Sequence, residues 1–116
     1  WSKIKHYSRM INDSWCVCCD FNNIRFADER IGSEVTVHEV VGFQDCIHYC
    51  DLEDLHTIGS YYTWNNKRIG DDRVCSRIDR VLVNEHWLDK FSDSYANFLP
   101  EGLNDHCPCV IRGFSK

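Results

Sequence analysis

Five polar side chains from three separate segments have the types needed to hydrolyse a phosphate ester; in chain order they are Asp20, Asn22, Asp79, Asp105 and His106. The first two follow an apolar run, the third lies inside a second apolar segment, and the last two precede a third. Carboxylates bind Mg²⁺, and a carboxylate can orient or deprotonate a water molecule. A histidine held by an aspartate can stabilise charge on a phosphate. Together they would supply metal-assisted phosphodiester hydrolysis.

Each of these residues also has a simpler interpretation, and the residue types alone leave both open. Asp20 is a common turn-capping residue. Asp79 has two arginines within two positions and would form half of a surface ion pair. Asp105 and His106 would be part of an ordinary polar loop. Polar groups at such places in or beside strands are costly unless they are hydrogen-bonded or used.

The chain has eight cysteines, a number that in a secreted protein would suggest a disulfide framework. Most of them lie inside apolar segments, where free cysteine behaves as a small buried hydrophobe. We therefore expect reduced, buried thiols in an intracellular protein, nuclear or cytoplasmic and not secreted. A zinc-binding module remains the alternative, with the pair Cys46 and Cys50 and the pair Cys107 and Cys109 as four ligands.

Composition limits the class of protein. The 116 residues suit a single domain spanning 1–116, and the 43% hydrophobic content is too high for a disordered chain. The net charge of −5 argues against strong unaided binding to nucleic acid, although bound cations would supply positive charge. No apolar run reaches the roughly 18 residues of a membrane span, and the polar, basic start of the chain does not resemble a secretory signal.

The elements that must position these side chains follow from the apolar pattern. Residues 15–19 form a continuous apolar run, which predicts a strand covered on both faces. Thr36 can cap a helix that runs from Val37 to about Asp51. The segments 61–66 and 75–84 flank a Gly-Asp turn and predict a hairpin. The remaining predictions are helices at 2–14 and 85–91, loops at 23–33 and 101–106, and strands at 94–100 and 107–114.

Helices alternate with strands in this order, and a hairpin lies among them. That pattern is typical of an α/β or α+β layered domain. We find no linker that would divide the chain. Asp20 and Asn22 would lie at the end of the first strand, and His106 at the start of the last.

Four segments in order resemble the endonuclease/exonuclease/phosphatase superfamily, whose fold is that of DNase I: CDFNNIRFADERIGS, YYTWNNKR, SRIDRVLVNEHW and NDHCPCVI. The likeness is greatest to the endonuclease domains of plant LINE-type retrotransposons, where the motifs read GDFN, TWSN, LDRVLVN and SDHCP. The match runs from about Trp15 to the end of the chain. It implies a Mg²⁺- or Mn²⁺-dependent endonuclease or phosphodiesterase that cleaves DNA.

The resemblance assigns a role to each matching residue. Asp20 would activate or orient the attacking water and contact the metal, and Asn22 would hold the scissile phosphate. Asp79 would pair with His106, which would contact the phosphate in the transition state. Asp105 would be associated with the metal. Thr63 and Trp64 belong to a strand that supports the site in that family.

The chain departs from the family in two motif positions and in length. Cys19 replaces a glycine, and Asn104 replaces a serine. The family domain is about twice as long, and its first half supplies a metal-binding glutamate that has no counterpart here. The resemblance therefore implies the carboxy-terminal half of such a domain: a partial DNase I-like sandwich, mainly one mixed sheet with flanking helices.

Three consequences follow from a half domain. Mg²⁺ binding should be weak and the activity impaired or absent. The uncovered sheet face should favour self-association. Two alternatives to a nuclease remain. The chain would be a non-catalytic interaction fragment that needs a partner to cover this face, or the zinc module described above.

Overall fold

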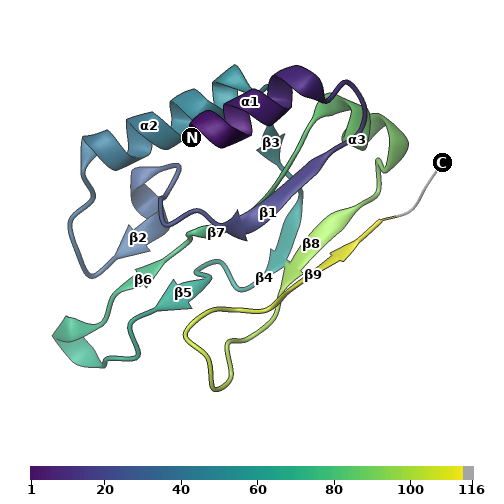
Figure 1. Cartoon of the computed structure of the whole chain (residues 1–116). Coiled ribbons are helices and arrows are strands. Elements are labelled where there is room, and N and C mark those ends of the chain that lie inside the picture. The colour runs from purple at the N-terminus through teal and green to yellow at the C-terminus, as the bar shows by residue number, and fades with distance from the viewer. Residues whose placement is uncertain (114–116) are drawn as a thin grey trace.

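The computed structural model describes residues 1–113 and shows a mixed α/β fold (Figure 1). Its helices are α1 (Ser2–Met10), α2 (Val37–Tyr49) and α3 (Glu85–Lys90), with 3-10 turns at Ala27–Glu29 and Gly70–Asp72. Its strands are β1 (Cys16–Asp20), β2 (Arg30–Ile31), β3 (Glu53–Asp54), β4 (Thr57–Gly59), β5 (Trp64–Asn65), β6 (Cys75–Ser76), β7 (Asp79–Val83), β8 (Tyr95–Phe98) and β9 (Cys109–Arg112).

The strands form three small sheets, so the single mixed sheet that we expected is divided. The sheet orders are β1-β7-β3, β2-β6-β5 and β4-β8-β9. All pairs are antiparallel except β4 with β8. Single hydrogen bonds link two of the sheets where the chain passes from β3 to β4: Leu55 N–H donates to Val81 O, and Ala96 N–H donates to His56 O.

The core surrounds β7, which is buried on both faces. Leu82 packs on one side in a cluster with Phe43 of α2. Val81 and Val83 point to the other side, into a cluster with Phe98 of β8. This alternation is that of a central strand. Because both faces are held by packing, the register of β7, and with it the position of Asp79 at its start, is set firmly.

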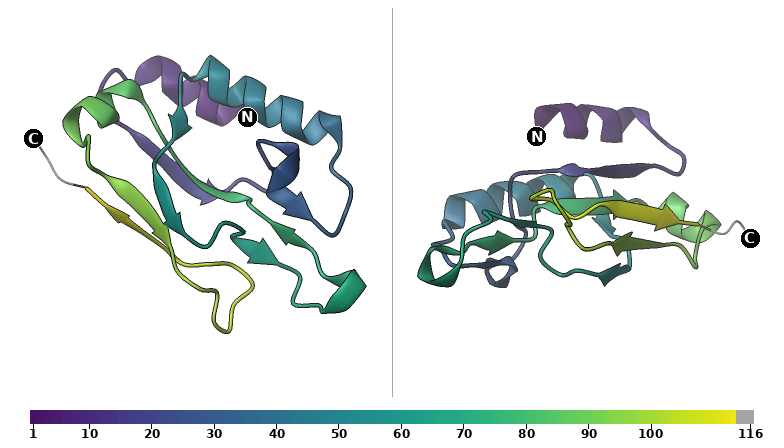
Figure 2. Two further views of the ribbon diagram at one scale, coloured as in Figure 1. Left: turned by 180° about the vertical axis from the view of Figure 1, so that it is seen from behind. Right: turned by 90° about the horizontal axis from the view of Figure 1, so that it is seen from below.

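Two helices begin at side-chain caps. Thr36 Oγ1 accepts a hydrogen bond from Glu39 N–H at 3.3 Å, as predicted for the start of α2. Asn84 Oδ1 accepts one from Trp87 N–H at 3.0 Å and starts α3. The first helix is shorter than the predicted 2–14, because the chain is extended again at Ile11. It lies on the outer side of β1 (Figure 2).

The prediction that the first strand is covered on both faces is wrong. β1 is an edge strand, and its second half is exposed at Cys18, Cys19 and Asp20. The predicted hairpin is confirmed in the pairing of β5 with β6, but the segment 75–84 is split into β6 and β7. The strand predicted at 107–114 is present as β9, and residue 114 lies outside the described residues.

No helix within residues 1–113 is both long enough and apolar enough to cross a membrane.

Candidate active site

Strand pairing brings the first two predicted residues together. β1 and β7 run antiparallel in a register that sets Asp20 opposite Asp79. The pairing continues one step further, since Phe21 N–H donates to Ile78 O at 2.9 Å. The end of β1 and the start of β7 therefore lie side by side, although 59 positions apart in the numbering (79 − 20). The two carboxylates reach the same edge of the sheet.

The chain turns sharply directly after Asp20. Asp20 Oδ1 accepts a hydrogen bond from Asn22 N–H at 2.8 Å, and Asn22 has a φ of 53°. Asparagine tolerates this left-handed conformation better than most residues. The turn-capping interpretation of Asp20 is therefore correct, but it uses only one carboxylate oxygen. The other oxygen, Oδ2, remains for the site.

His106 reaches the site from the segment that precedes β9. Strand β5 holds this segment: Trp64 and His106 form a β-bridge, and Asn65 N–H donates to the Asp105 carbonyl at 3.1 Å. Cys107 N–H donates to Thr63 O at 2.8 Å. These backbone bonds on either side of His106 fix the place from which its side chain projects.

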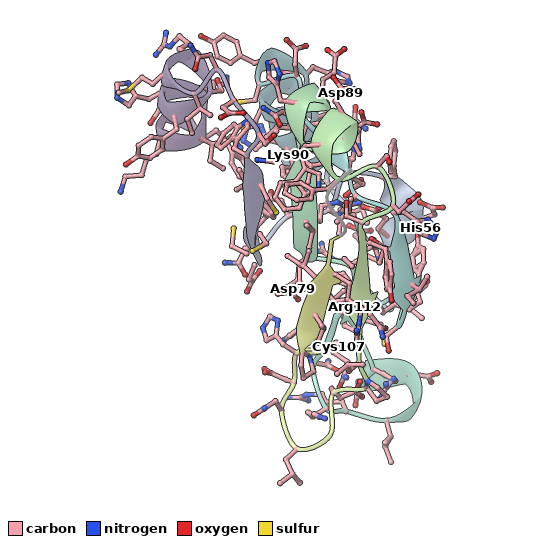
Figure 3. All side chains as sticks on the ribbon, turned by 90° about the vertical axis from the view of Figure 1, so that its right-hand side faces the viewer. His56, Asp79, Asp89, Lys90, Cys107 and Arg112 are labelled. Atoms are coloured by element: carbon pink, nitrogen blue, oxygen red, sulfur yellow. The ribbon has the colours of Figure 1, made fainter. Side chains whose placement is uncertain are left out.

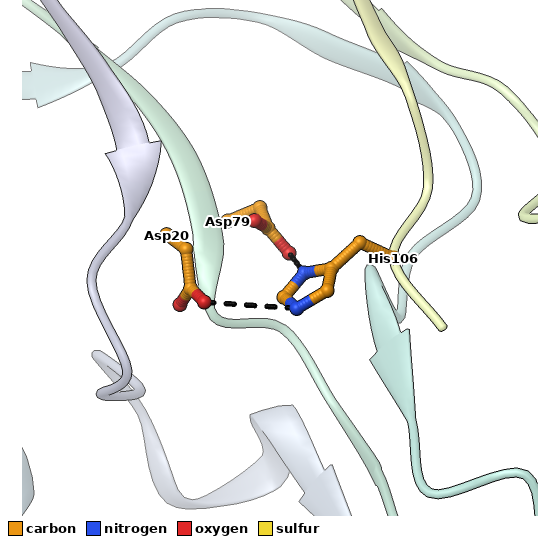
Figure 4. A group of neighbouring side chains, drawn as sticks. All are labelled: Asp20, Asp79 and His106. Carbon is orange, nitrogen blue, oxygen red and sulfur yellow. Dashed lines mark hydrogen bonds and ion pairs between the residues drawn. The ribbon is translucent and has the colours of Figure 1, made fainter. Parts of the chain in front are cut away.

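The three side chains converge, as Figure 4 shows. His106 Nδ1 lies 2.9 Å from Asp79 Oδ2, and His106 Nε2 lies 3.6 Å from Asp20 Oδ2. An ionised carboxylate can only accept hydrogen bonds, so Nδ1 carries the proton and donates a hydrogen bond to Asp79. Nε2 is then the nitrogen that faces Asp20 and solvent. The imidazole and the Asp20 side chain are 36% and 34% exposed, which leaves Nε2 accessible to a ligand.

The surroundings raise the pKa of His106 above its ordinary value. Burial lowers that pKa, but the hydrogen bond to Asp79 and the charges of Asp79, Asp20 and Asp105 outweigh burial. The carboxylates stabilise the imidazolium because opposite charges nearby favour the charged form. His106 can therefore carry a proton, and a positive charge, at a higher pH than an isolated histidine.

The remaining two predicted residues lie beside this group. Asn22 lines a cavity of about 350 Å³ together with His106 and Trp64. Asp105 is turned aside, because its carboxylate Oδ2 accepts a hydrogen bond from Trp64 Nε1 at 3.3 Å. It is absent from the one group of three or more possible ligand side chains found among the described residues, Asp20, Asp79 and His106. The structure thus brings Asp20, Asp79 and His106 together and leaves Asp105 at the margin.

Thr63 connects the two halves of the Asp79–His106 pair. It is fully buried, and its Oγ1 accepts hydrogen bonds from Ile78 N–H at 3.1 Å and Asp79 N–H at 3.0 Å. Its carbonyl accepts from Cys107 N–H, the residue after His106. These bonds also explain why the ladder breaks between β6 and β7. The resemblance marked Thr63 as supporting, but nothing in the residue pattern predicted these bonds.

A buried ionic network holds the chain that follows β1. Arg80 is paired with Glu29 and, at 3.0 Å, with Asp54, which also binds Arg25 at 2.9 Å. Arg80 lies on the opposite face of β7 from Asp79, so the surface ion pair considered for Asp79 does not form with this arginine. Burial lowers the pKa of Arg80, but the bonds and charges of Glu29 and Asp54 raise it overall. Sequence reasoning missed this network, since Arg80 and Glu29 are 51 positions apart.

All eight cysteines are free thiols, as predicted, but only half of them are buried. Cys18, Cys19 and Cys109 are exposed and Cys16 is half-buried. The two pairs proposed for zinc do not meet: Cys46 and Cys50 pack in the cluster beneath α2, and Cys107 in the cluster on the other side of β7. Figure 3 shows Cys107 close to Asp79, away from Asp89 and Lys90 of α3.

Comparison with protein-family models and curated proteins identifies no relative of the chain. No protein-family model matches the chain, and no curated protein matches it significantly. The motifs and the geometry of the Asp20–Asp79–His106 group are therefore the features that point to a function.

Proposed function

We propose that the chain is the carboxy-terminal part of a metal-dependent phosphodiesterase of the endonuclease/exonuclease/phosphatase superfamily. Such an enzyme hydrolyses the phosphodiester bonds of nucleic acids, and we propose that this activity is impaired or absent in the chain itself. The proposal includes the finer fold assignment, a partial DNase I-like sandwich. The observation that carries it is the convergence of three side chains: His106 is hydrogen-bonded to Asp79 through Nδ1, and its Nε2 lies 3.6 Å from Asp20 Oδ2. The free thiols suit a place inside the cell, in the nucleus or cytoplasm.

The geometry suits one arrangement of roles. Asp79 accepts a hydrogen bond from Nδ1–H, so Nε2 of a protonated His106 can donate a hydrogen bond to a phosphate oxygen and stabilise its developing charge. Asp20 Oδ2, 3.6 Å away, can orient a water molecule on the neighbouring side. Asn22 borders the same cavity as His106 and has an amide to offer a phosphate oxygen.

The donor set fits the implied Mg²⁺ only in part. Asp20 offers the carboxylate oxygen that Mg²⁺ prefers, but the predicted second ligand, Asp105, is held by Trp64. The metal would supply charge stabilisation on the phosphate. With one carboxylate available we expect weak binding and a low rate, since misplacement by about 1 Å can cost about 100-fold.

A binding experiment tests this function without requiring turnover. The His106 imidazole resonance is followed by NMR while a short duplex DNA oligonucleotide is added with Mg²⁺. We expect a saturable shift of His106 that is much reduced in the Asn22→Ala variant. The exposed His86 provides the internal control and should not shift. An unshifted His106 at saturating DNA, or equal shifts of His86, would contradict the proposal.

Plasmid nicking with Mg²⁺ or Mn²⁺ measures activity directly. We expect feeble nicking by the parent chain, lost in His106→Ala and retained in His86→Ala. Robust nicking by the parent would show that this part of the site suffices alone, and nicking that survives in His106→Ala would show that another group performs it.

A non-catalytic interaction fragment is the second candidate, and the edges of the sheets favour it. β1 and β9 are both edge strands with exposed residues, among them Cys19 and Val110. Unpaired strand edges and exposed apolar residues promote association with a partner or with a second copy. Light scattering after size exclusion should then show a concentration-dependent increase in mass, whereas a constant monomer mass would remove self-association from consideration.

A further inference from the structure

The neutral form of His106 presents a second kind of chemistry. Because Nδ1–H is directed at Asp79, the neutral imidazole has its lone pair on Nε2. In this form Nε2 and the carboxylate oxygen Oδ2 of Asp20, which lie 3.6 Å apart, each offer an electron pair. Two electron-pair donors in this arrangement can bind one cation between them.

The spacing of these donors favours one class of ion. For zinc, metal–ligand distances near 2.0–2.2 Å and a tetrahedral angle place two ligand atoms about 3.4 Å apart. For octahedral Mg²⁺ the corresponding separation is about 2.9 Å. The observed 3.6 Å is closer to the tetrahedral value. Imidazole nitrogen is also a ligand that zinc and its neighbours accept, whereas Mg²⁺ prefers oxygen.

Asp79 supplies the outer support that such sites need. A metal-bound histidine usually donates its other ring N–H to a carboxylate, which fixes the tautomer and the ring orientation. The 2.9 Å bond from Nδ1 to Asp79 is of this kind. The ring is therefore already oriented for a metal, and Thr63 fixes Asp79 in turn through its backbone N–H.

We propose that His106 Nε2 and Asp20 Oδ2 form a binding site for a tetrahedral transition-metal ion of the Zn²⁺ class, with Asp79 orienting His106 through the hydrogen bond to Nδ1. Both ligand side chains are about one-third exposed, so the remaining coordination positions are open to water or to an added ligand. This site goes beyond the proposed hydrolysis, in which His106 contacts phosphate and not a metal, and it does not require the chain to be a nuclease.

Cobalt(II) is the probe that tests the site, because its absorption spectrum reports both geometry and ligand type. Titration of the reduced chain with Co²⁺ should give the visible bands of a four-coordinate ion with nitrogen and oxygen ligands, and Zn²⁺ should displace it. His106→Ala and Asp20→Asn should abolish these bands. Asp79→Asn, which changes no ligand, should weaken the affinity about 10- to 100-fold. Asp89→Asn removes an exposed carboxylate on α3, outside the site, and should leave the affinity nearly unchanged.

Three results would overturn the proposal. A strong thiolate-to-cobalt charge-transfer band that persists in His106→Ala would place the ion at the cysteines. Equal losses in Asp89→Asn and Asp20→Asn would indicate diffuse attraction to negative charge. Visible bands that are unchanged in Asp20→Asn would remove the carboxylate from the ligand set. Far-ultraviolet circular dichroism of each variant shows that the fold is retained, and His106→Gln serves as a second variant at the ligand position.

Discussion

At the scale of single residues, the site depends on the different partners of the two nitrogens of His106. Nδ1 is hydrogen-bonded to Asp79 at 2.9 Å, and Nε2 faces Asp20 and solvent. Protonated, Nε2 can donate to a phosphate; neutral, it can bind a metal. Both proposals therefore rest on the same hydrogen bond, and Asp79 is the residue to change first.

Asp79→Asn should lower the pKa of His106. Burial opposes the charged imidazole, and the hydrogen bond and charge of Asp79 are the largest influences in the other direction. The pH titration of the imidazole C–H resonances by NMR measures this. Asp105→Asn should lower the pKa less, because Asp105 contributes charge without a hydrogen bond to the ring. A His106 pKa that is the same in Asp79→Asn and in the parent would show that the bond has little strength in solution.

The raised pKa of His106 also predicts how stability depends on pH. A group whose folded-state pKa lies above the unfolded value stabilises the fold fully below the unfolded pKa, about 6.5 for histidine, and loses this effect as pH rises through the folded pKa. The parent should thus exceed His106→Gln in free energy of unfolding most clearly at mildly acidic pH, and the difference should fade as pH rises. Urea denaturation across a pH series measures it. A pH-independent difference for His106→Gln would contradict the linkage.

At the scale of elements, the short strand β5 and the residue before it decide whether the pair can form. Thr63 joins the start of β7 to the segment that carries His106, through Oγ1 on one side and its carbonyl on the other. The loop after β1 is fastened separately, by Glu29 and Arg80. Asp79 and His106 thus depend on Thr63, whereas the chain at Arg25 and Phe26 is held by Glu29, which accepts their backbone N–H groups.

Thr63→Val should destabilise the fold, because valine keeps the shape but removes the acceptor of two N–H groups. Each buried donor left unpaired costs about 1–3 kcal/mol. Thr63→Ser keeps the oxygen and should cost less, and it should also preserve the raised pKa of His106. Urea denaturation and NMR titration give the two readouts. Equal destabilisation by valine and serine would mean that the methyl group, and not the hydroxyl, is what matters.

Arg80→Met should be more damaging, since it leaves the buried Glu29 without its arginine and leaves Asp54 paired with Arg25 alone. Removing one member of a buried ion pair typically costs about 3–5 kcal/mol. Adding Glu29→Gln to this variant should recover part of the loss. Arg68→Met, at an exposed arginine, is the matched control and should change the free energy of unfolding by less than about 0.5 kcal/mol. A loss for Arg80→Met as small as that of the control would show that the network contributes little.

At the scale of the whole molecule, the thiols report which surfaces are covered. Brief alkylation of the native chain with iodoacetamide should modify Cys18, Cys19 and Cys109, which are exposed at the edges formed by β1 and β9. The four buried thiols should react only after unfolding; they are Cys46, Cys50, Cys75 and Cys107.

Peptide mass spectrometry locates the modified residues. Although Cys19 and Cys109 are exposed, partial burial of their thiols raises the pKa of both. Because the thiolate is the reactive form, their alkylation should become faster as pH rises. Equal rates at all eight cysteines would mean that the native core opens readily. Protection of Cys18 and Cys109 in the native chain would point instead to a second copy that covers these edges.

Much of the local structure follows from the sequence alone. Thr36 with its apolar stripe defines α2, and the run ending at Cys19 defines most of β1, because caps and periodicity depend on residues close in the chain. The candidate residues Asp20, Asp79 and His106 were also identifiable, as reactive types beside apolar segments and within four ordered motifs. What each of them contacts was not.

Tertiary structure decided those contacts. Asp79 binds His106, 27 positions away, while the adjacent Arg80 faces the other side of β7 and binds Glu29, 51 positions away. The one-residue alternation of a strand separates these neighbours, and the packing of β7 on both faces decides which side each one takes. Asp105 is excluded because its carboxylate accepts a hydrogen bond from the indole N–H of Trp64, 41 positions away. These side-chain contacts depend on strand register and long-range packing, which cannot be predicted from a local sequence pattern.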